Sequence, residues 1–199
     1  MSFLRAFVRD PRGAVAAEFA MVVPIMIIFL LGILDVGYYA WAINRGEKAT
    51  QMGARWAVAT NMVPSDLAAY SFATSGGVPQ GTTVPAADFP GVTCTSTGCT
   101  CKATCGFGLT RDADAFNAIV GRMQDFKGSI APENVQIDYD YSGLGYAGDP
   151  NGPDVAPIVT VSLVNMEHRP LYGLLIGSVD LPDFAYSLTS EDGEGTYSN

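Results

Sequence analysis

One carboxylate in this chain occupies a costly position. Glu18 lies at the start of a run of about 25 mostly apolar residues, long enough to cross the hydrocarbon core of a bilayer as a single helix. A charged side chain inside such a run costs on the order of 2.5–3.5 kcal/mol, so it requires a partner or access to the interface. Two interpretations follow: Glu18 pairs with a positive charge in lipid, or it reaches back to the inner interface.

A second carboxylate, Asp35, interrupts the far end of the same run. Tyr38 and Tyr39 follow it by three and four residues, so either phenol could donate to the Asp35 carboxylate across one helical turn. Alternatively, Asp35 lies at the outer interface of a membrane beside an aromatic belt that includes Trp41. The second interpretation is favoured, because aromatic residues concentrate at that depth.

All four cysteines lie in one short stretch, with the spacing Cys94-x4-Cys99-x-Cys101-x3-Cys105. An even, clustered set predicts two disulfides if this part of the chain is exported. A zinc site would need separated ligand pairs or histidines, and His168 is the one histidine of the sequence. A redox-active pair is disfavoured by the absence of a Cys-x-x-Cys motif. Three disulfide pairings are possible, and the spacing does not choose among them.

The remaining groups of polar residues do not form a recognisable catalytic motif, so we do not expect an enzyme. The segment 149–154 offers oxygen ligands close to Asp138 and Asp140, and a calcium site is conceivable there. The EF-hand order of ligands is not met, so a solvated turn is favoured. No nucleophile elbow, phosphate-binding glycine loop or plausible catalytic triad occurs. We expect neither a metal nor another cofactor.

The charge distribution separates the two ends of the chain. Arg5, Arg9 and Arg12 precede the apolar run, which predicts that the N-terminal end stays in the cytoplasm and the rest is exported. From residue 44 onward the chain has 8 basic and 17 acidic residues, a net charge of −9. An acidic outer region argues against binding to nucleic acid or anionic lipid.

Hydrophobic periodicity predicts an α+β fold. A helix is expected from residue 14 to about 60, crossing the membrane over 14–43 and continuing as an amphipathic extension over 44–63. The outer domain, 64–199, is expected to contain an irregular, disulfide-stapled loop over 73–106 and a second helix over 110–127. Strands are expected over 135–141, 157–165 and 184–189, and a buried connection over 171–181.

The amphipathic extension presents two candidate faces. Ala49, Met52, Trp56 and Ala59 form a stripe at helical spacing, while Gly46, Ala49, Gly53 and Ala57 form a row of small residues. A row of small side chains lets another backbone approach closely. That neighbour is either another chain or the protein's own outer domain, and the sequence leaves both open.

The N-terminal residues also carry a family resemblance. The segment resembles TadE-like pseudopilins, the minor pilins of tight-adherence (Flp-type) pili. Their processing site is a glycine, four residues, a glutamate and an aromatic residue, matched here by Gly13, Ala14, Glu18 and Phe19. Phe19 departs mildly from the tyrosine of many major pilins. The resemblance covers roughly residues 11–60 and includes the stretches 20–24, 32–37 and 53–57.

The resemblance implies a structural role. Residues 1–13 would be a cytoplasmic leader that a prepilin peptidase removes after Gly13, leaving Ala14 as the new N-terminus. Glu18 would then help to recruit the subunit to a growing pilus. The implied fold is a long N-terminal transmembrane helix packed on a small antiparallel sheet.

The partners implied are the peptidase, the lipid bilayer, major and minor pilins and an inner-membrane assembly platform. The protein would sit in the inner membrane with a periplasmic domain, and on the cell surface after assembly, where it would contribute to pilus initiation, tip or adhesion. A cleaved secretory signal is the weakest alternative. A permanently anchored periplasmic binding module of a secretion or envelope complex is the main one.

Overall fold

The computed structural model describes residues 11–171 and 177–190, with side chains from Val15 onward. The chain forms two compact units. One consists of residues up to 42 together with 168–179, and the other of residues 43–167 together with those from 180 onward. The fold is α+β, with a long apolar N-terminal helix, an antiparallel sheet, a further helix and two disulfides.

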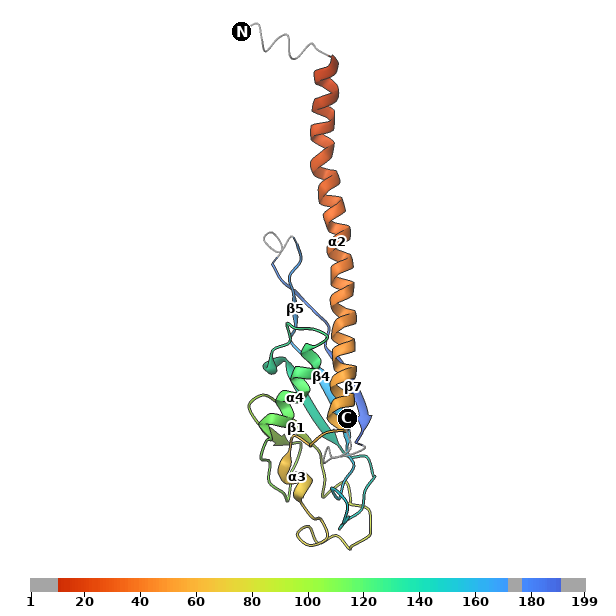
Figure 1. Ribbon diagram of the computed structural model, residues 1–199, viewed down its shortest axis with the longest axis vertical. Coiled ribbons are helices and arrows are strands. Elements are labelled where there is room, and N and C mark those ends of the chain that lie inside the picture. The colour runs from red at the N-terminus through yellow and green to blue at the C-terminus, as the bar shows by residue number, and fades with distance from the viewer. Residues whose placement is uncertain (1–10, 172–176, 191–199) are drawn as a thin grey trace. The chain divides into compact units, whose positions relative to one another are not determined.

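The helices and strands follow the order in Figure 1. Helix α2 continues unbroken through Pro24 and contains Gly13 and Ala14 in its first turn. In chain order the elements are α2 (Pro11–Val58), α3 (Ser65–Ala69), β1 (Val92–Cys94), β2 (Cys99–Cys101), α4 (Ala113–Gln124), the 3-10 turn η1 (Pro132–Asn134), β3 (Val135–Asp140), β4 (Ile158–Leu163), β5 (Glu167–His168), β6 (Val179–Asp180) and β7 (Phe184–Thr189).

The main sheet has five antiparallel strands in the order β2-β1-β3-β4-β7, and β5 pairs with β6 in a separate small sheet. Apolar and polar residues alternate along β3 and β4, so one face of the sheet is buried and the other is polar. Tyr139 lies opposite Val159 and Val92 on the buried face, and its phenol oxygen accepts the backbone N–H of Val63 at 3.0 Å. Burial raises the pKa of this phenol.

The last turns of α2 pack on this sheet through the row of small residues. Ala49, Ala54 and Ala57 are buried. A side-chain carbon added at Gly53 would lie 2.7 Å from Met123 of α4 and 3.3 Å from Val161 of β4. Trp56, which the sequence analysis grouped in the apolar stripe, is 37% exposed. Only small side chains fit where the helix and the sheet lie this close together.

Helix α4 covers the same face of the sheet (Figure 1). Four residues of its predicted apolar stripe are buried, Phe116, Ile119, Val120 and Met123, whereas the fifth, Phe126, lies beyond the end of the helix and is half-buried. The helix spans Ala113–Gln124, shorter than the expected range 110–127, and its N-cap is Asp112. The Asp112 carboxylate accepts the backbone N–H groups of Asp114 and Ala115, each at 2.9 Å.

Two further expectations are corrected. The segment 73–106 is not wholly irregular, since it contains the hairpin of β1 and β2 and joins the sheet through β1. The connection 171–181 is not buried along its described parts: Leu171 is 64% and Val179 is 42% exposed, and only Leu181 is buried. The remaining residues of that connection, 172–176, lie outside the described residues.

Candidate processing and assembly site

The residues of the predicted processing site share one helix. The backbone of α2 is helical from Pro11 onward, so Gly13 and Ala14 lie in its first turn. Proline suits that position because its missing N–H would be unpaired there in any helix. Glu18 follows Ala14 by four residues, on the same side of the helix and about 6 Å further along its axis.

The surface beyond Glu18 is apolar and uncovered. Phe19 is exposed, as are most of the large apolar residues that follow as far as Val36; Val23 and Leu31 are half-buried. A soluble protein rarely exposes so much contiguous apolar surface, because it would associate or precipitate in water. Among the described residues α2 is the one helix long and apolar enough to cross a membrane, and none of its most apolar stretch is buried within the molecule. Lipid is the environment that such a surface fits.

Comparison with protein families agrees with this geometry. Residues 13–55 match the model of the family described as TadE-like protein. The N-terminal segment is therefore TadE-like. The match begins at Gly13 and includes Glu18, Phe19 and Asp35.

The TadE-like segment indicates a protein associated with Tad pili. Proteins of this kind are structural components, and other pilus components are the partners that the family implies. The segment and its apolar helix together indicate membrane anchoring and pilus association. No curated protein and no solved structure matches the chain.

The middle of the TadE-like segment contacts His168 and Leu171. The Asp35 carboxylate accepts the backbone N–H of Leu171 at 2.6 Å, a partner that sequence reasoning did not identify. The ring of His168 lies 4.9 Å from that of Tyr38 and 5.4 Å from that of Tyr39. The two tyrosines thus pack around a buried histidine, whose Nε2 has no hydrogen-bond partner in the described part of the chain.

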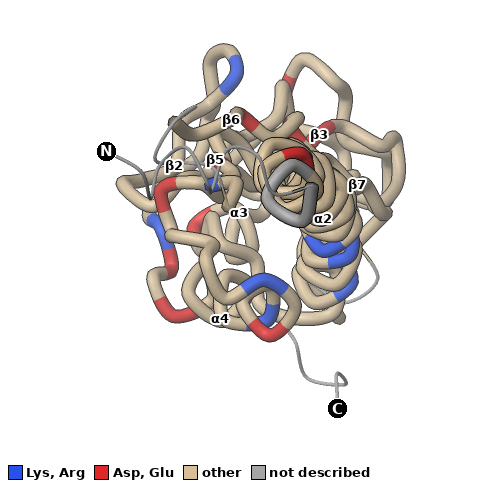
Figure 2. The backbone as a smooth tube through the Cα atoms, turned by 90° about the horizontal axis from the view of Figure 1, so that it is seen from above, with Lys and Arg blue, Asp and Glu red and all other residues tan. Residues whose placement is uncertain are grey.

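The last part of α2 carries its basic residues on one side, as Figure 2 shows. Arg45, Lys48 and Arg55 recur at three- and seven-residue intervals, which brings them to one side of a helix. The Arg45 guanidinium donates to the backbone carbonyl of Phe126 at the end of α4. Partial burial, with a smaller contribution from the charge of Arg45, lowers the pKa of Lys127.

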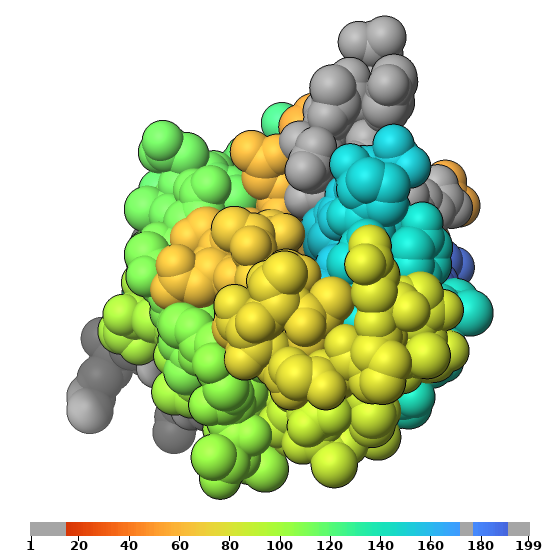
Figure 3. Space-filling model, turned by 90° about the horizontal axis from the view of Figure 1, so that it is seen from below, coloured from red at the N-terminus to blue at the C-terminus, as the bar shows by residue number. Residues whose placement is uncertain are grey.

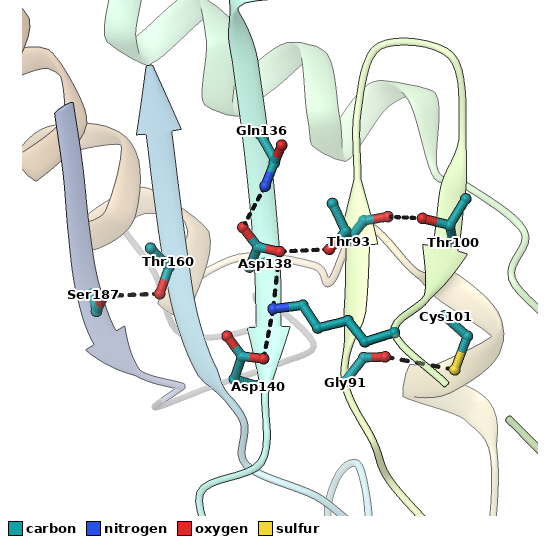
Figure 4. Close-up of polar contacts among 10 residues, drawn as sticks. Gly91, Thr93, Thr100, Cys101, Gln136, Asp138, Asp140, Thr160 and Ser187 are labelled. Carbon is teal, nitrogen blue, oxygen red and sulfur yellow. Dashed lines mark hydrogen bonds and ion pairs between the residues drawn. The ribbon is translucent and has the colours of Figure 1, made fainter. Parts of the chain in front are cut away.

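The outer face of the sheet carries a polar row that the sequence did not reveal (Figure 4). Asp138 lies opposite Thr93 on β1 and Thr160 on β4, and Thr160 shares a hydrogen bond of 2.8 Å with Ser187 of β7. The Asp138 carboxylate accepts bonds from Thr93 at 2.5 Å and from Gln136 at 2.8 Å. This row crosses four strands, so it joins segments far apart in the chain.

Lys102 crosses this row just beyond β2. Its ammonium lies 3.1 Å from the Asp138 carboxylate and 2.7 Å from that of Asp140. Burial alone would raise the pKa of Asp138, but the hydrogen bonds from Thr93, Gln136 and Lys102 outweigh it and lower the pKa. Likewise, partial burial opposes the charge on Lys102, yet its bonds to the two carboxylates raise its pKa. The alternation in β3 placed both aspartates on one face, but nothing local pointed to Lys102.

The cysteines form two local disulfides, Cys94–Cys99 and Cys101–Cys105. The first links the facing ends of β1 and β2, where Cys94 is buried in the core. The second ties the end of β2 to the loop that follows. No cysteine in the described part of the chain is free. The structure thus selects one of the three possible pairings.

The carboxylates that the sequence suggested for a calcium site serve structural roles instead. Asp154 is only 4% exposed, and it accepts the backbone N–H of Phe72 at 2.6 Å and that of Asp149 at 3.0 Å. It braces two loops, so the expectation of a solvated turn is wrong for this residue. Among the described residues, no group of three or more His, Cys, Asp or Glu could hold a metal ion.

The loops that Asp154 braces help to form the face seen in Figure 3. That face includes α3, the loop before β1, the green segment that follows β2 and the segment that follows β3. A hollow of about 240 Å³ lies among these loops, lined by Tyr70, Ser75, Asp88 and Thr104. The Tyr70 ring contacts those of Phe72 and Phe107, which fix its orientation.

Proposed function

We propose that this protein is a minor pilin, or pseudopilin, of a Tad pilus. A prepilin peptidase would cut the chain between Gly13 and Ala14, and α2 would hold the mature subunit in the inner membrane until assembly. The observation that carries the proposal is the TadE-like segment itself, an exposed apolar helix with Gly13 and Glu18 at its start. The size of the outer domain favours a minor subunit, because the major pilins of this pilus type are little more than the helix.

The proposed cut creates the partner that Glu18 requires. A new α-ammonium at Ala14 would lie one helical turn before the Glu18 carboxylate. Opposite charges attract strongly where water is excluded, so the pair offsets much of the cost of placing either group in lipid. A pair formed between neighbouring subunits would select the register in which a new subunit enters the fibre. In this interpretation Phe19 contacts lipid or a neighbouring helix.

The outer domain supplies contact surfaces for initiation, for the tip of the fibre or for adhesion. Two disulfides cross-link the hairpin and the loop that follows it, ring contacts hold Tyr70, and both regions are rich in hydroxyl groups. A pre-organised surface loses little conformational entropy when it binds, which suits a contact with another minor pilin or an external surface. Nucleic acid is not expected as a partner of this acidic domain.

N-terminal sequencing of the membrane-extracted protein tests the proposal. A mature chain that begins at Ala14 supports it, whereas a retained Met1 or Ser2 contradicts it and favours the permanently anchored periplasmic module. Gly13→Leu should block the cut, because the peptidase must accommodate a very small residue beside the scissile bond. Ala16→Leu is the matched control: it makes the same kind of size change within the helix and should still be cut.

A further inference from the structure

The hollow on the face shown in Figure 3 brings one aromatic ring and several polar side chains together. Its volume is about 240 Å³, and Tyr70, Ser75, Asp88 and Thr104 are among the residues that line it. The hydroxyls and the carboxylate of these four residues have no hydrogen-bond or ion-pair partner in the part of the chain that the structure describes. Their donors and acceptors are therefore available to a ligand.

The aromatic wall of the hollow is held from behind. The Tyr70 ring meets that of Phe72 edge-on, with 4.9 Å between the ring centroids, and it lies 5.7 Å from that of Phe107. Phe72 is buried, and its backbone N–H donates to the Asp154 carboxylate at 2.6 Å. Gly76 lies in the turn that follows, where an added side-chain carbon would be 2.8 Å from the carbonyl oxygen of Phe72. The ring of Tyr70 is thus in position before any ligand arrives.

The polar side chains lie on anchored loops. Asp88 precedes the buried Phe89, whose backbone N–H closes a turn with a hydrogen bond of 3.2 Å. Thr104 lies inside the loop that the Cys101–Cys105 disulfide closes. A site whose groups are already in position loses little conformational entropy when it binds a ligand.

The charge and chemistry of the lining favour a neutral ligand that carries hydroxyl groups. Asp88 is the one charged residue among the described residues that line the hollow, so an anion would be repelled. A sugar ring presents C–H groups that pack on an aromatic ring, and hydroxyls that bond to carboxylates, serines and threonines. Sites for drug-sized ligands have volumes of about 300–1,000 Å³, so this smaller hollow suits a single sugar ring.

We propose that this hollow binds one neutral hexose unit of a glycan. The C–H face of the sugar would lie against the Tyr70 ring, and its hydroxyls would donate to the Asp88 carboxylate. Ser75 and Thr104 would bond to the remaining hydroxyls at the rim. The inference rests on the proposed function and deepens it, because it names the class of ligand that one contact surface of the outer domain binds.

A protonated amine is the competing ligand, because cations also bind to an aromatic ring beside a carboxylate. An ammonium group has donors and no acceptor, so it offers nothing to the hydroxyl protons of Tyr70, Ser75 and Thr104. Asp88 is exposed, and an ion pair in contact with water contributes little. A sugar hydroxyl both donates and accepts, so a hexose uses the lining more fully.

Saturation-transfer NMR detects the weak binding expected of a single sugar. The full-length chain is prepared in micelles of a detergent without a sugar head group, because such a head group would compete for the hollow. The probes are glucose, galactose, mannose and N-acetylglucosamine, with glucuronate as the anionic probe and butylamine as the cationic one. We expect at least one neutral sugar to receive saturation on its C–H protons, with a millimolar dissociation constant, and the two charged probes to receive none.

Variants of the lining locate the site. Asp88→Ala and Tyr70→Leu should each weaken binding by about tenfold, because they remove the carboxylate acceptor and the ring. Tyr70→Phe retains the ring and should bind within about threefold of the wild type. The matched controls are Asp180→Ala, which removes another exposed aspartate, and Tyr146→Leu, which removes a tyrosine that is 40% exposed outside the hollow. Both controls should bind normally.

Circular dichroism establishes that each variant is folded. Because the Asp88 side chain is exposed, Asp88→Ala decides the question even if Tyr70→Leu does not fold. The absence of saturation transfer to every neutral sugar overturns the inference. Equal binding by Asp88→Ala and the wild type also overturns it, because the sugar would then bind elsewhere. Binding of butylamine without binding of any sugar identifies an ammonium site and overturns it as well.

N-terminal sequencing of the same preparation separates this inference from the proposed function. A chain that begins at Ala14 but binds no sugar contradicts the inference and leaves the proposed function intact. A chain that retains Met1, while its sugar binding depends on Asp88, contradicts the proposed pilin and supports the hollow as a sugar site.

Discussion

Asp138 lies on the polar face of the sheet, yet it is buried. Three donors from different segments, Thr93, Gln136 and Lys102, surround its carboxylate, and they favour its ionised form. A group of this kind stabilises the fold only while it is charged. Asp138 therefore contributes to the acid stability of the outer domain, through partners that come from β1, β3 and the residue just after β2.

We expect Asp138→Asn to reduce the pH dependence of stability on the acid side. The folded pKa of Asp138 lies below the ordinary value of 3.8, so its contribution is fully present above that value and is lost as pH falls through the folded pKa. The wild type should thus lose stability more steeply than the variant below about pH 4. Urea unfolding of the detergent-solubilised protein at several pH values measures both slopes, and parallel slopes would contradict the assignment.

Lys102 makes the opposite contribution at alkaline pH. Its folded pKa lies above the ordinary value of 10.5, so its contribution is present below that value and is lost as pH rises through the folded pKa. The same measurements above pH 10 should show a decline that Lys102→Met removes. Lys48→Met is the matched control, because Lys48 is exposed on α2 and forms no ion pair with a carboxylate that the structure describes.

At the scale of elements, the close packing of α2 on the sheet requires a residue without a side chain at Gly53. Gly53→Leu should destabilise the outer domain by about 1–3 kcal/mol, because the added atoms would overlap Met123 and Val161. Gly121→Ala, on the exposed side of α4, has nothing within 4 Å of the added carbon and should be neutral or slightly stabilising. Thermal unfolding monitored by circular dichroism compares the two, and an equal effect would argue against close packing at Gly53.

The two disulfides should differ in what their loss costs. Each closes a loop of only a few residues, so each constrains the unfolded chain by a similar amount, about 2 kcal/mol. Replacing the Cys94–Cys99 pair with serines also buries a hydroxyl at residue 94, which costs a further ~1–3 kcal/mol. The Cys101–Cys105 pair lacks that additional cost. Urea midpoints of the two double-serine variants should therefore differ, and a double-alanine variant of the first pair should recover part of the difference.

Elements whose patterns are local could be predicted from the sequence. The apolar run, the stripe of α4 and the alternation in β3, β4 and β7 each identified an element that the structure contains. The strands β1 and β2 could not be predicted, because each has only three residues and is defined by its pairing with a neighbouring strand. Periodicity also did not decide which face of α2 meets the sheet, because it identifies apolar faces, whereas the sheet accepts the face with the smallest side chains.

In the candidate site, too, only the features that are local in sequence could be predicted. Gly13, Ala14, Glu18 and Phe19 are adjacent in sequence, so their spacing alone suggested a role. The partner of Asp35 is the backbone of Leu171, 136 residues away, and no side-chain pattern encodes a backbone donor. Lys102 likewise reaches Asp138 only through the register of three strands. Contacts of this kind emerge from topology, so a single sequence does not show them.

At the scale of the whole molecule, Glu18 should matter for assembly and not for anchoring. Glu18→Ala makes the apolar run more apolar, so insertion should persist and the cut after Gly13 should remain largely intact. The subunit would lose its charged partner in lipid, and we expect fewer pili on the cell surface. Electron microscopy of cells, with immunoblotting of the membrane fraction, measures both effects. Glu47→Ala removes an exposed carboxylate further along the same helix and should leave pili normal. Normal piliation in the Glu18 variant would refute the pairing.

The order of elements along the chain determines what a single proteolytic cleavage would release. Helix α2 ends at Val58, and all five strands of the main sheet begin at Val92 or later, while both disulfides close within residues 94–105. No disulfide therefore bridges the two halves. One peptide-bond cleavage in the stretch 59–91 would leave two polypeptides, one carrying the anchor and the other carrying the complete sheet. After such a cleavage they would remain together through non-covalent contacts, among them the packing of residues 43–58 on the sheet, the hydrogen bond from Leu171 to Asp35 and the ring contacts of His168. A protease acting at these loops could thus free the outer domain from the cell without reducing agent, as soon as that packing opened.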